Sequence, residues 1–582
     1  MYRLKLLATA GLIALSGCAG LGDYHKSDAP RTLRADVVAL DQPITYNRFG
    51  SFNPYGMIYA LANDVEPAES HRIGYSHCAA IYRLKLKDDV RPRPLVLRGN
   101  QGDRLQVRFT NNLLPNDPDF WGATGQPNTS KCRWHDVEPA PRPSGTYDEI
   151  RYNPYPKNDY DIDHGNLRPK ERREDAAADL AEHAEDGALP TEEEIDAAID
   201  EQDSTNWPAT RTASFVVSGM TALRGATCDD YDRTPNDPDI WRDARDPKVT
   251  GIEPIQPGAC FVYEYVLGEP GTHLFFSLGA PSGGQGDGGS LVHGLFGSVN
   301  VQPRGSRYYR SQVTADIMTD ARNQAAAPAL IDFEAKDDQG TPLLNMLKLA
   351  PGTPDVYDLI HGDLNAVIVD CDSRHWKKDR CQDAFGTPLD AAFREFTVIF
   401  HDELKTFYPE PIEELGEEYQ LEGIGDAFAI NYGASGMGGI LLANRKGFGP
   451  AKDCLECLYE EFFLQSWANG DPALLTDYPD DPANVHHSYL GDRVEFRNLH
   501  AGPKETHVFH LHAHQWLAQQ DEPDSGESFG TYLDSQTIAP QQGFAYNIYY
   551  GGSGNRNQTP GDSIFHCHLY PHFAQGMWAL WR

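Results

Sequence analysis

The chain is 582 residues long, which allows several domains, because a single hydrophobic core rarely grows beyond about 250–300 residues. It carries 85 acidic and 50 basic residues, a formal net charge of -35 at pH 7. This charge argues against nucleic acids and anionic lipid surfaces as partners, whereas metal ions and cationic molecules would be attracted. A large net negative charge also keeps a protein soluble, so the charge by itself does not identify a function.

Residues 1–17 form a bacterial signal peptide rather than part of the fold. Two basic residues, Arg3 and Lys5, precede an apolar run that is too short to span a bilayer as a helix. The following Leu-Ser-Gly-Cys resembles a lipoprotein cleavage box, with Cys18 as the lipidated first residue of the mature chain. Ala19 after it favours the outer membrane. We therefore expect a lipid-anchored protein of the bacterial cell envelope, facing the periplasm or the cell surface; an ordinary secreted signal is the alternative.

Cysteine usage fits an oxidising compartment. Of the ten cysteines, eight remain after the lipidated one and one discussed below, and this even number predicts structural disulfides. Cys371 with Cys381 is the simplest local pair, although eight cysteines allow roughly a hundred pairings. Cys454 and Cys457 have the spacing of a redox or zinc motif, but no second such pair completes a zinc set, so disulfide bonding is favoured.

Alternation of apolar and polar residues begins at Ile81, after a tether and lead-in over residues 18–80. It continues through Arg93–Leu113, where Gly-Asp turns interrupt it. This pattern is typical of half-buried strands in a β-sandwich. A first sandwich domain is therefore predicted over residues 81–303.

A polar segment interrupts this domain at about residues 114–205. It is rich in proline, aspartate and asparagine, and its later part is rich in alanine and glutamate. Thr191 and Glu194 have the spacing of a capping box, in which each side chain binds a backbone N–H group of the other residue at the start of a helix. We expect one or two exposed helices within this insertion.

A second sandwich is predicted over residues 393–582. Strand alternation is weak over residues 304–392, which we interpret as a connector, with a third, degenerate domain as the alternative. Alternation returns in FREFTVIFHDEL at Phe393–Leu404 and again at Gly491–Leu499. The predicted fold class is therefore all-β, with two β-sandwich domains and a polar, partly helical insertion in the first.

The densest group of candidate metal ligands lies near the end of the chain, in the stretch IFHCHLYPHFAQGM. Cys567 lies between His566 and His568, with His572 five residues and Met577 ten residues after it. A strand directs alternate side chains to opposite faces, so Cys567 and the two flanking histidines belong to different sites. Two histidines, a thiolate and a weak axial methionine are the ligands of a blue-copper electron-transfer site, which needs one further histidine.

A second stretch, THVFHLHAHQW, supplies four more histidines within eight residues. The two stretches together resemble the closing motifs of the multicopper oxidase family. This resemblance implies copper as the cofactor and cupredoxin-like Greek-key sandwiches as the fold. By the resemblance, the type 1 copper ligands are His507, Cys567, His572 and Met577. The ligands that the last domain gives to the trinuclear cluster are His510, His512, His566 and His568.

The first predicted sandwich departs from the family in the two stretches that complete the trinuclear cluster, TASFVVSGM and GTHLFFSLGA. Where the family has two His-x-His pairs, this chain has Val216 with Ser218 and Phe276 with Leu278. None of these is a usable copper ligand. His273 lies an odd number of residues from Phe276, so it is expected on the opposite strand face. The oxygen-reducing centre is therefore expected to keep half of its ligands, which would lie beside apolar valine and phenylalanine.

The opening REFTVIF of the second sandwich looks like the paired domains of ceruloplasmin and of bacterial manganese-oxidising multicopper oxidases. The resemblance implies a copper-dependent oxidoreductase that transfers single electrons through the type 1 copper, with Cys567, His507 and His572 in the central roles and a small reductant or a redox protein as donor. A copper-binding or storage lipoprotein without turnover is one alternative. A full oxidase of phenols, cuprous ions or manganous ions, completed by a partner chain in a homo- or hetero-oligomer, is the other.

Overall fold

The fold is described from a computed structural model. The described residues, with gaps of a few residues inside some ranges, are 30–47, 52–74, 80–113, 212–243, 255–279, 290–369, 392–406, 426–434, 481–517 and 532–582, with isolated positions within 177–195 and at 473. The predicted signal peptide with Cys18, most of the insertion, and the predicted cysteine pairs 371–381 and 454–457 lie outside them. Within the described part of the chain, no helix combines the length and the apolar character needed to cross a membrane.

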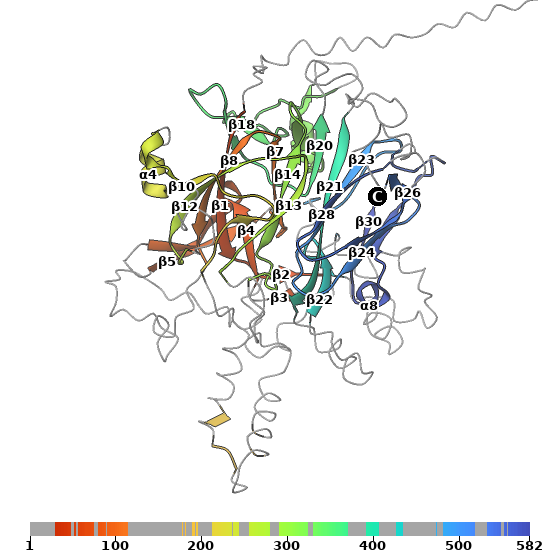
Figure 1. Ribbon diagram of the computed structural model, residues 1–582, viewed down its shortest axis with the longest axis horizontal. Helices are drawn as coiled ribbons and strands as arrows, with labels where there is room; N and C mark the ends of the chain where they lie inside the picture. The colour runs from red at the N-terminus through yellow and green to blue at the C-terminus, as the bar shows by residue number, and fades with distance from the viewer. Residues whose placement is uncertain are drawn as a thin grey trace, which may run out of the picture.

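The first β-sandwich packs an eight-stranded sheet against a four-stranded sheet (Figure 1). The larger sheet has the order β11, β10, β12, β8, β1, β19, β18, with β4 paired to β1. Its strands are β1 (Thr32–Asp41), β4 (Met57–Leu61), β8 (Arg104–Asn111), β10 (Arg224–Thr227), β11 (Arg242–Asp243), β12 (Cys260–Val266), β18 (Leu347–Leu349) and β19 (Val356–Leu359). The smaller sheet, in spatial order, comprises β7 (Leu95–Asn100), β14 (Phe296–Gln302), β13 (Gly271–Phe276) and β9 (Val216–Val217).

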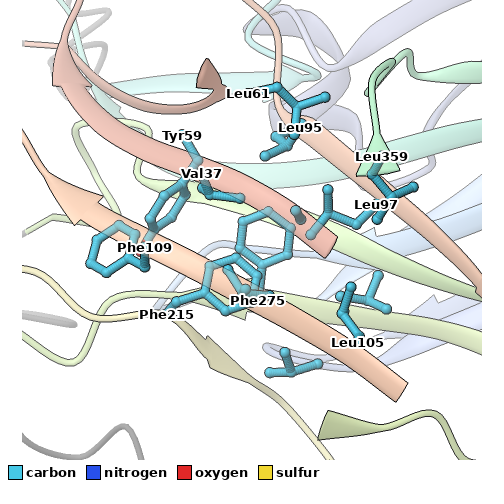
Figure 2. Packing of buried hydrophobic residues seen from close by; sticks show 14 of the residues in the cluster. Val37, Tyr59, Leu61, Leu95, Leu97, Leu105, Phe109, Phe215, Phe275 and Leu359 are labelled. Carbon is cyan, nitrogen blue, oxygen red and sulfur yellow. The ribbon is translucent and has the colours of Figure 1, made fainter. Parts of the chain in front are cut away.

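Aromatic rings fill much of the space between these two sheets (Figure 2). Phe215 stacks on Phe275 with 4.4 Å between ring centroids, and Tyr59 meets Phe275 edge-on at 5.2 Å. The Tyr59 hydroxyl donates a hydrogen bond of 2.6 Å to the carbonyl oxygen of Ser214, which satisfies the polar end of a buried ring. Such ring pairs add about 0.5–1.5 kcal/mol each beyond the burial of their area.

The second β-sandwich packs a six-stranded sheet against another four-stranded sheet. The six-stranded sheet has the order β15, β20, β21, β23, β28, with β22 paired to β21. Its strands are β15 (Arg307–Arg310), β20 (Asn365–Val369), β21 (Phe393–Lys405), β22 (Asp426–Ile430), β23 (Val494–His500) and β28 (Gly543–Asn547). The four-stranded sheet, in spatial order, comprises β27 (Ser535–Ile538), β24 (His507–Leu511), β29 (Ser563–Cys567) and β30 (Trp578–Trp581).

Two-stranded sheets and short helices lie outside the main sheets of the two sandwiches. Four two-stranded sheets pair β2 (Ile44–Thr45) with β3 (Phe52–Asn53), β5 (Val65–Gly74) with β6 (Ala80–Leu86), β16 (Arg322–Asn323) with β17 (Leu330–Ile331), and β25 (Trp516–Leu517) with β26 (Tyr532–Leu533). The helices are η1 (Ala62–Asp64), α4 (Cys228–Arg233), η5 (Pro238–Ile240), α5 (Ala315–Asp320) and α8 (Tyr570–Ala574). The expected all-β class is thus confirmed.

The structure differs from the sequence-based segmentation in two places. The lead-in over residues 18–80 contributes β1 and β4 to the first sandwich, where β1 lies in the middle of the larger sheet between β8 and β19. The reason is that β4 is buried at every position, so it lacks the alternation that marks a half-exposed strand. The connector over residues 304–392 gives β18 and β19 to the first sandwich and β15 and β20 to the second, so it joins the two.

Two local expectations concern the insertion and the cysteines. The capping box is present, since the backbone N–H of Glu194 donates to Thr191 Oγ1 at 3.3 Å and the backbone N–H of Thr191 donates to Glu194 Oε2 at 2.8 Å. A structural disulfide joins Cys228 to Cys260 and links α4 to β12. The predicted presence of structural disulfides is confirmed by this pair.

A buried carboxylate joins the two sandwiches. Glu395 on β21 is fully buried and accepts hydrogen bonds from Arg98 Nε at 2.8 Å and from Arg497 Nε at 3.0 Å. Asn300 Nδ2 donates to the same carboxylate at 3.0 Å, and Gln302 Nε2 also donates to it. Burial alone would raise the pKa of Glu395, but the two guanidinium groups outweigh it and hold the pKa at about 2. The ionised side chain therefore ties β7 and β14 of the first sandwich to the second.

Replacing Glu395 by Gln removes the counter-charge of buried Arg98 and one of the two carboxylates paired with Arg497, and it is expected to lower the free energy of unfolding at pH 7 by about 3–5 kcal/mol. Because the folded-state pKa is about 2 against 4.5 for the free side chain, the wild-type contribution is complete above about pH 4.5 and lost as the pH falls toward 2. The difference between the two proteins in denaturant titrations should therefore shrink over this range.

The matched control is Glu66→Gln, which removes the same charge from a half-exposed ion pair with Lys85 at 3.1 Å. It should change the free energy of unfolding by less than about 1 kcal/mol. A Glu395→Gln deficit that stays constant from pH 7 to pH 3 would contradict the buried ion pair.

Candidate metal centres

The two ligand-rich strands, β24 and β29, lie side by side and antiparallel. Phe509 is paired with Cys567, and His510 with His566. Cys567 and Phe509 point into the core of the second sandwich, whereas the two histidines point to the other face of the sheet. The separation of Cys567 from its flanking histidines, predicted from strand alternation, is therefore confirmed.

The inner face of these strands gathers one thiol and two imidazoles. Cys567 Sγ lies 3.5 Å from Nδ1 of His572 and 3.7 Å from Nδ1 of His507, and the two Nδ1 atoms lie 3.0 Å apart. All three side chains are buried. Burial raises the pKa of the Cys567 thiol to about 11, because the thiolate would lose its hydration. At neutral pH the sulfur therefore keeps its proton unless a cation replaces it.

A tight return of the chain places Met577 beside this cluster. After β29, the short helix α8 carries His572, and Gly576 adopts a positive φ of 118° that turns the chain back. The Met577 N–H then donates to the His572 carbonyl oxygen at 3.1 Å, and its own carbonyl oxygen accepts from the Cys567 N–H at 3.1 Å. Met577 is fully buried in the same core cluster as Cys567. The structure thus brings all four predicted type 1 ligands together.

Carboxylates stand behind both imidazoles, and sequence reasoning missed them. Glu505 Oε2 accepts a hydrogen bond of 2.9 Å from His572 Nε2. Asp402 Oδ1 lies 3.8 Å from His507 Nε2. Glu505 lies in the turn before β24, and its partner His572 is 67 residues away, so strand alternation gives no signal for it. Asp402 is more than a hundred residues away in sequence and also left no such signal.

Asp402 is held in place by the turn between β23 and β24. Its Oδ2 accepts backbone hydrogen bonds from Lys504 at 3.1 Å and from Glu505 at 2.6 Å. A Cβ on Gly502 would lie only 1.3 Å from Asp402 Oδ1, so only glycine permits this approach. Burial would raise the pKa of Asp402, but the hydrogen bonds that its carboxylate accepts outweigh it and hold the pKa well below its usual range. The side chain is therefore a fixed anion.

The outer face of β24 and β29 carries the second predicted cluster, formed by His510, His512, His566 and His568. His512 Nε2 and His566 Nε2 lie 3.1 Å apart, and the ring of His568 lies 4.9 Å from that of His510. His512 and His568 are exposed, whereas His566 is buried under Phe573, whose ring stacks on it at 4.2 Å. The four side chains predicted to form the remnant half-site thus lie together on one surface.

Hydrogen bonds orient two of these rings. His566 Nδ1 donates to the Cys567 carbonyl oxygen at 2.8 Å, and His510 Nδ1 lies 2.9 Å from the Asp534 carbonyl oxygen. With the proton on Nδ1, each ring presents the lone pair of Nε2. Donor atoms of His510, His512 and His566 lie within 4.8 Å of one another. This arrangement is able to hold a metal ion. Ligating histidines are commonly oriented by a hydrogen bond from the ring nitrogen that does not bind the metal, and Nδ1 makes such a bond here.

The structure corrects the expected surroundings of this quartet. Phe276 and Leu278 belong to the apolar cluster between the two sandwiches. The same cluster contains Ile399 of β21. The sheet that carries β24 lies on the far side of the six-stranded sheet (Figure 1), and the quartet is on the face of that sheet that is turned away from the core. Val216 and Ser218 lie with β13 in the first sandwich. The family alignment identifies which residues stand at the ligand positions. Whether those residues lie near the quartet depends on how the two sandwiches pack against each other.

His273 lies where strand alternation predicted. On β13, His273 and Phe275 are two residues apart and therefore lie on the same face of the strand, where Phe275 packs in the core of the first sandwich. Phe276 lies on the opposite face, toward the second sandwich. His273 Nδ1 lies 3.2 Å from the Ser218 carbonyl oxygen, and burial lowers the pKa of His273. It is a hydrogen-bonded, half-buried histidine distant from both clusters.

Comparison with known proteins gives only a coarse likeness. No family model and no curated protein matches the chain. A copper nitrite reductase from Nitrosomonas europaea aligns at 10% identity and a TM-score of 0.35 over 94% of this chain and 93% of that chain. A multicopper oxidase aligns at 10% and 0.34 over 95% and 88%, and a blue copper oxidase from Nitrosomonas europaea at 10% and 0.31 over 94% and 85%. At these scores the likeness carries no functional conclusion.

Gly502→Ala is expected to displace Asp402 and to lower the free energy of unfolding by about 1–3 kcal/mol, the usual cost of forcing an extra methyl group into packed structure. Chemical denaturation of the metal-free protein measures this difference. Gly268→Ala is the matched control, because a Cβ there meets nothing within 4 Å. Equal stability of the two variants would show that the turn does not hold Asp402 as described.

Proposed function

We propose that the protein is a copper-dependent oxidoreductase that passes single electrons through a type 1 copper. Its ligands would be His507, Cys567, His572 and, in the axial position, Met577. One observation carries the proposal: a buried thiol and two imidazole Nδ1 atoms lie within 3.7 Å of one another, and a buried methionine is hydrogen-bonded to the same stretch of backbone. Two histidines, a thiolate and a weak axial methionine are the ligands of blue-copper electron-transfer sites.

The distances between the donor atoms fit a single ion. Typical bonds of about 2.0 Å to nitrogen and about 2.3 Å to sulfur, at angles between tetrahedral and trigonal, place the nitrogen and sulfur atoms about 3.5–3.7 Å apart. The Cys567 sulfur lies 3.5 Å and 3.7 Å from the two nitrogens. The nitrogen pair, at 3.0 Å, is slightly closer than the roughly 3.3–3.5 Å that two such bonds imply. A small outward rotation of the imidazoles would complete the site.

The surrounding side chains hold the ligands in one arrangement. Phe428 stacks on His572 with 4.3 Å between ring centroids, and Glu505 binds the outer nitrogen of the same ring. Burial raises the pKa of the Cys567 thiol, and the neighbouring backbone of Val508 and Leu569 lowers it in part. Hydrogen bonding around the sulfur is one of the factors that tune the potential of a blue-copper site. Copper, when bound, would supply the one-electron couple, and these packed groups would keep its ligands in place in both oxidation states.

Electrons would leave the inner site toward the outer face. Cys567 is joined through the backbone to His566 and His568, which stand in the outer quartet. A covalent path therefore connects the inner sulfur with the four imidazoles. Because the positions that complete a trinuclear centre in the family carry no ligands here, we propose that a single chain does not reduce dioxygen to water.

A second candidate function is favoured by the exposure of the quartet. His512 and His568 are exposed, and the face that carries them points away from the first sandwich of the same chain. Another protein docked on this face would reach all four imidazoles and could add the missing ligands. In that case the assembly, and not the single chain, would be a complete oxidase.

We also propose that Cys18 carries lipid and anchors the protein in the bacterial envelope, which rests on the cleavage box in the sequence. At least two acyl chains are needed for stable anchoring, because one chain gives only marginal binding. Such an anchor would keep the copper site near a membrane-bound or periplasmic electron donor.

Copper-loaded wild-type protein should be blue, and Cys567→Ser should lose the colour, because the charge-transfer band requires the thiolate. The visible absorption spectrum and copper content per chain measure this. His487→Gln is the control, since His487 belongs to neither cluster. A Cys567→Ser protein that remains blue, or a wild type that binds copper without colour or redox cycling, would contradict the proposal; the latter result would favour storage.

Oxygen uptake separates the two candidate functions. With a phenolic donor, the isolated wild-type chain should bleach reversibly and consume oxygen only at the background rate. The measurement combines an oxygen electrode, visible absorption and sedimentation. Oxygen uptake that increases with oligomer formation would instead support the oxidase completed by a partner chain. In that case His512→Gln should abolish the oxygen uptake, while the blue colour should still bleach on addition of the phenolic donor.

A further inference from the structure

Two buried polar atoms face each other behind the inner cluster. His507 Nε2 and Asp402 Oδ1 lie 3.8 Å apart, which is too long for a hydrogen bond. Both side chains are completely buried, and among the residues that the structure describes neither atom has a hydrogen-bond partner. Buried polar groups are normally paired, so this gap needs a physical reason.

The tautomers of the two imidazoles explain the gap. His572 Nε2 lies 2.9 Å from the Glu505 carboxylate and must donate to it, which leaves a lone pair on His572 Nδ1 in the neutral ring. The 3.0 Å contact between the two Nδ1 atoms then requires that His507 carry its hydrogen on Nδ1. His507 Nε2 is therefore a lone pair that faces a carboxylate oxygen, and two acceptors do not approach closely.

Ligation of a metal by His507 reverses this situation. Nδ1 must offer its lone pair, so the imidazole hydrogen moves to Nε2 with no net gain or loss of a proton. Nε2 then becomes a donor aimed at Asp402. On the basis of the proposed copper site, we propose that Asp402 is the positioning residue of His507: when copper binds, it accepts the Nε2 hydrogen and stabilises the tautomer that ligates the metal.

The backbone around Asp402 supports this role. The pairing of β21 with β22 slips between His401 and Leu404, and Glu403 adopts a positive φ of 62°, so a bulge turns Asp402 inward. Two backbone N–H groups then hold its Oδ2. Because Asp402 is fixed, a small rotation of the His507 ring, which is stacked on His500, would close the gap. A carboxylate on the outer nitrogen raises the basicity of a ligating histidine, which stabilises copper(II) over copper(I).

The test is Asp402→Asn. In this variant the amide oxygen must accept from the two backbone N–H groups, so the amide NH₂ faces His507 Nε2. It donates to the lone pair there and stabilises the tautomer that cannot bind through Nδ1, as an Asp-to-Asn change does in the serine protease triad. We expect the metal-free variant to melt at the wild-type temperature or higher. Its copper(II) affinity should fall about 10–100-fold, and the copper reduction potential should rise.

Glu403→Gln is the matched control, since it removes the same charge one residue away from a side chain paired with Lys504. It should keep the wild-type copper affinity and potential. If the wild type takes up copper and Asp402→Asn has the same copper affinity and reduction potential, the role of Asp402 would be overturned, whereas the proposed function would stand. A lower melting temperature of the metal-free variant would assign Asp402 to the fold and also overturn this role. A wild type that takes up no copper would overturn the proposed function and this role together.

Discussion

The structure depends on one buried ionic contact, between the Glu395 carboxylate and the guanidinium groups of Arg98 and Arg497. A buried charge is tolerated only when it is paired and hydrogen-bonded, and here the amides of Asn300 and Gln302 complete the shell. Because the partners come from both sandwiches, the contact is satisfied only when the two pack in this one orientation. The apolar cluster around it adds area, but apolar contacts alone are less selective about orientation.

The same strand that carries Glu395 also reaches the inner metal cluster. Along β21, Phe396 and Phe400 face the core that surrounds Cys567, and the bulge after His401 then directs Asp402 toward the turn before His507. The strand therefore connects the contact between the sandwiches to the carboxylate behind a ligand. The carboxylate proposed to position a ligand is thus placed by the central strand of the domain.

Burial divides the histidines of the second sandwich into two chemical classes. The inner pair lies buried beside Cys567, whose thiol keeps its proton until a cation replaces it, because burial raises its pKa. The outer quartet is partly exposed, so its rings stay accessible to ions and to other proteins. One pair of neighbouring strands thus carries a buried cluster on its inner face and a partly exposed cluster on its outer face.

The sequence by itself determined the features that depend on short spacing. Alternation along a strand separates Cys567 from His566 whatever the rest of the fold does, and the five-residue and ten-residue spacings bring back His572 and Met577 through one short turn. The all-β class and the capping box at Thr191 follow from similarly local patterns.

Only the tertiary structure decided what depends on distant segments. Asp402 and Glu395 carry no local pattern, because their partners lie about a hundred residues or more away in the chain. The strand β4 was missed because complete burial erases alternation. The quartet faces away from Phe276 because the six-stranded sheet and its core lie between them, and no spacing within the chain encodes which face of one sandwich packs against the other.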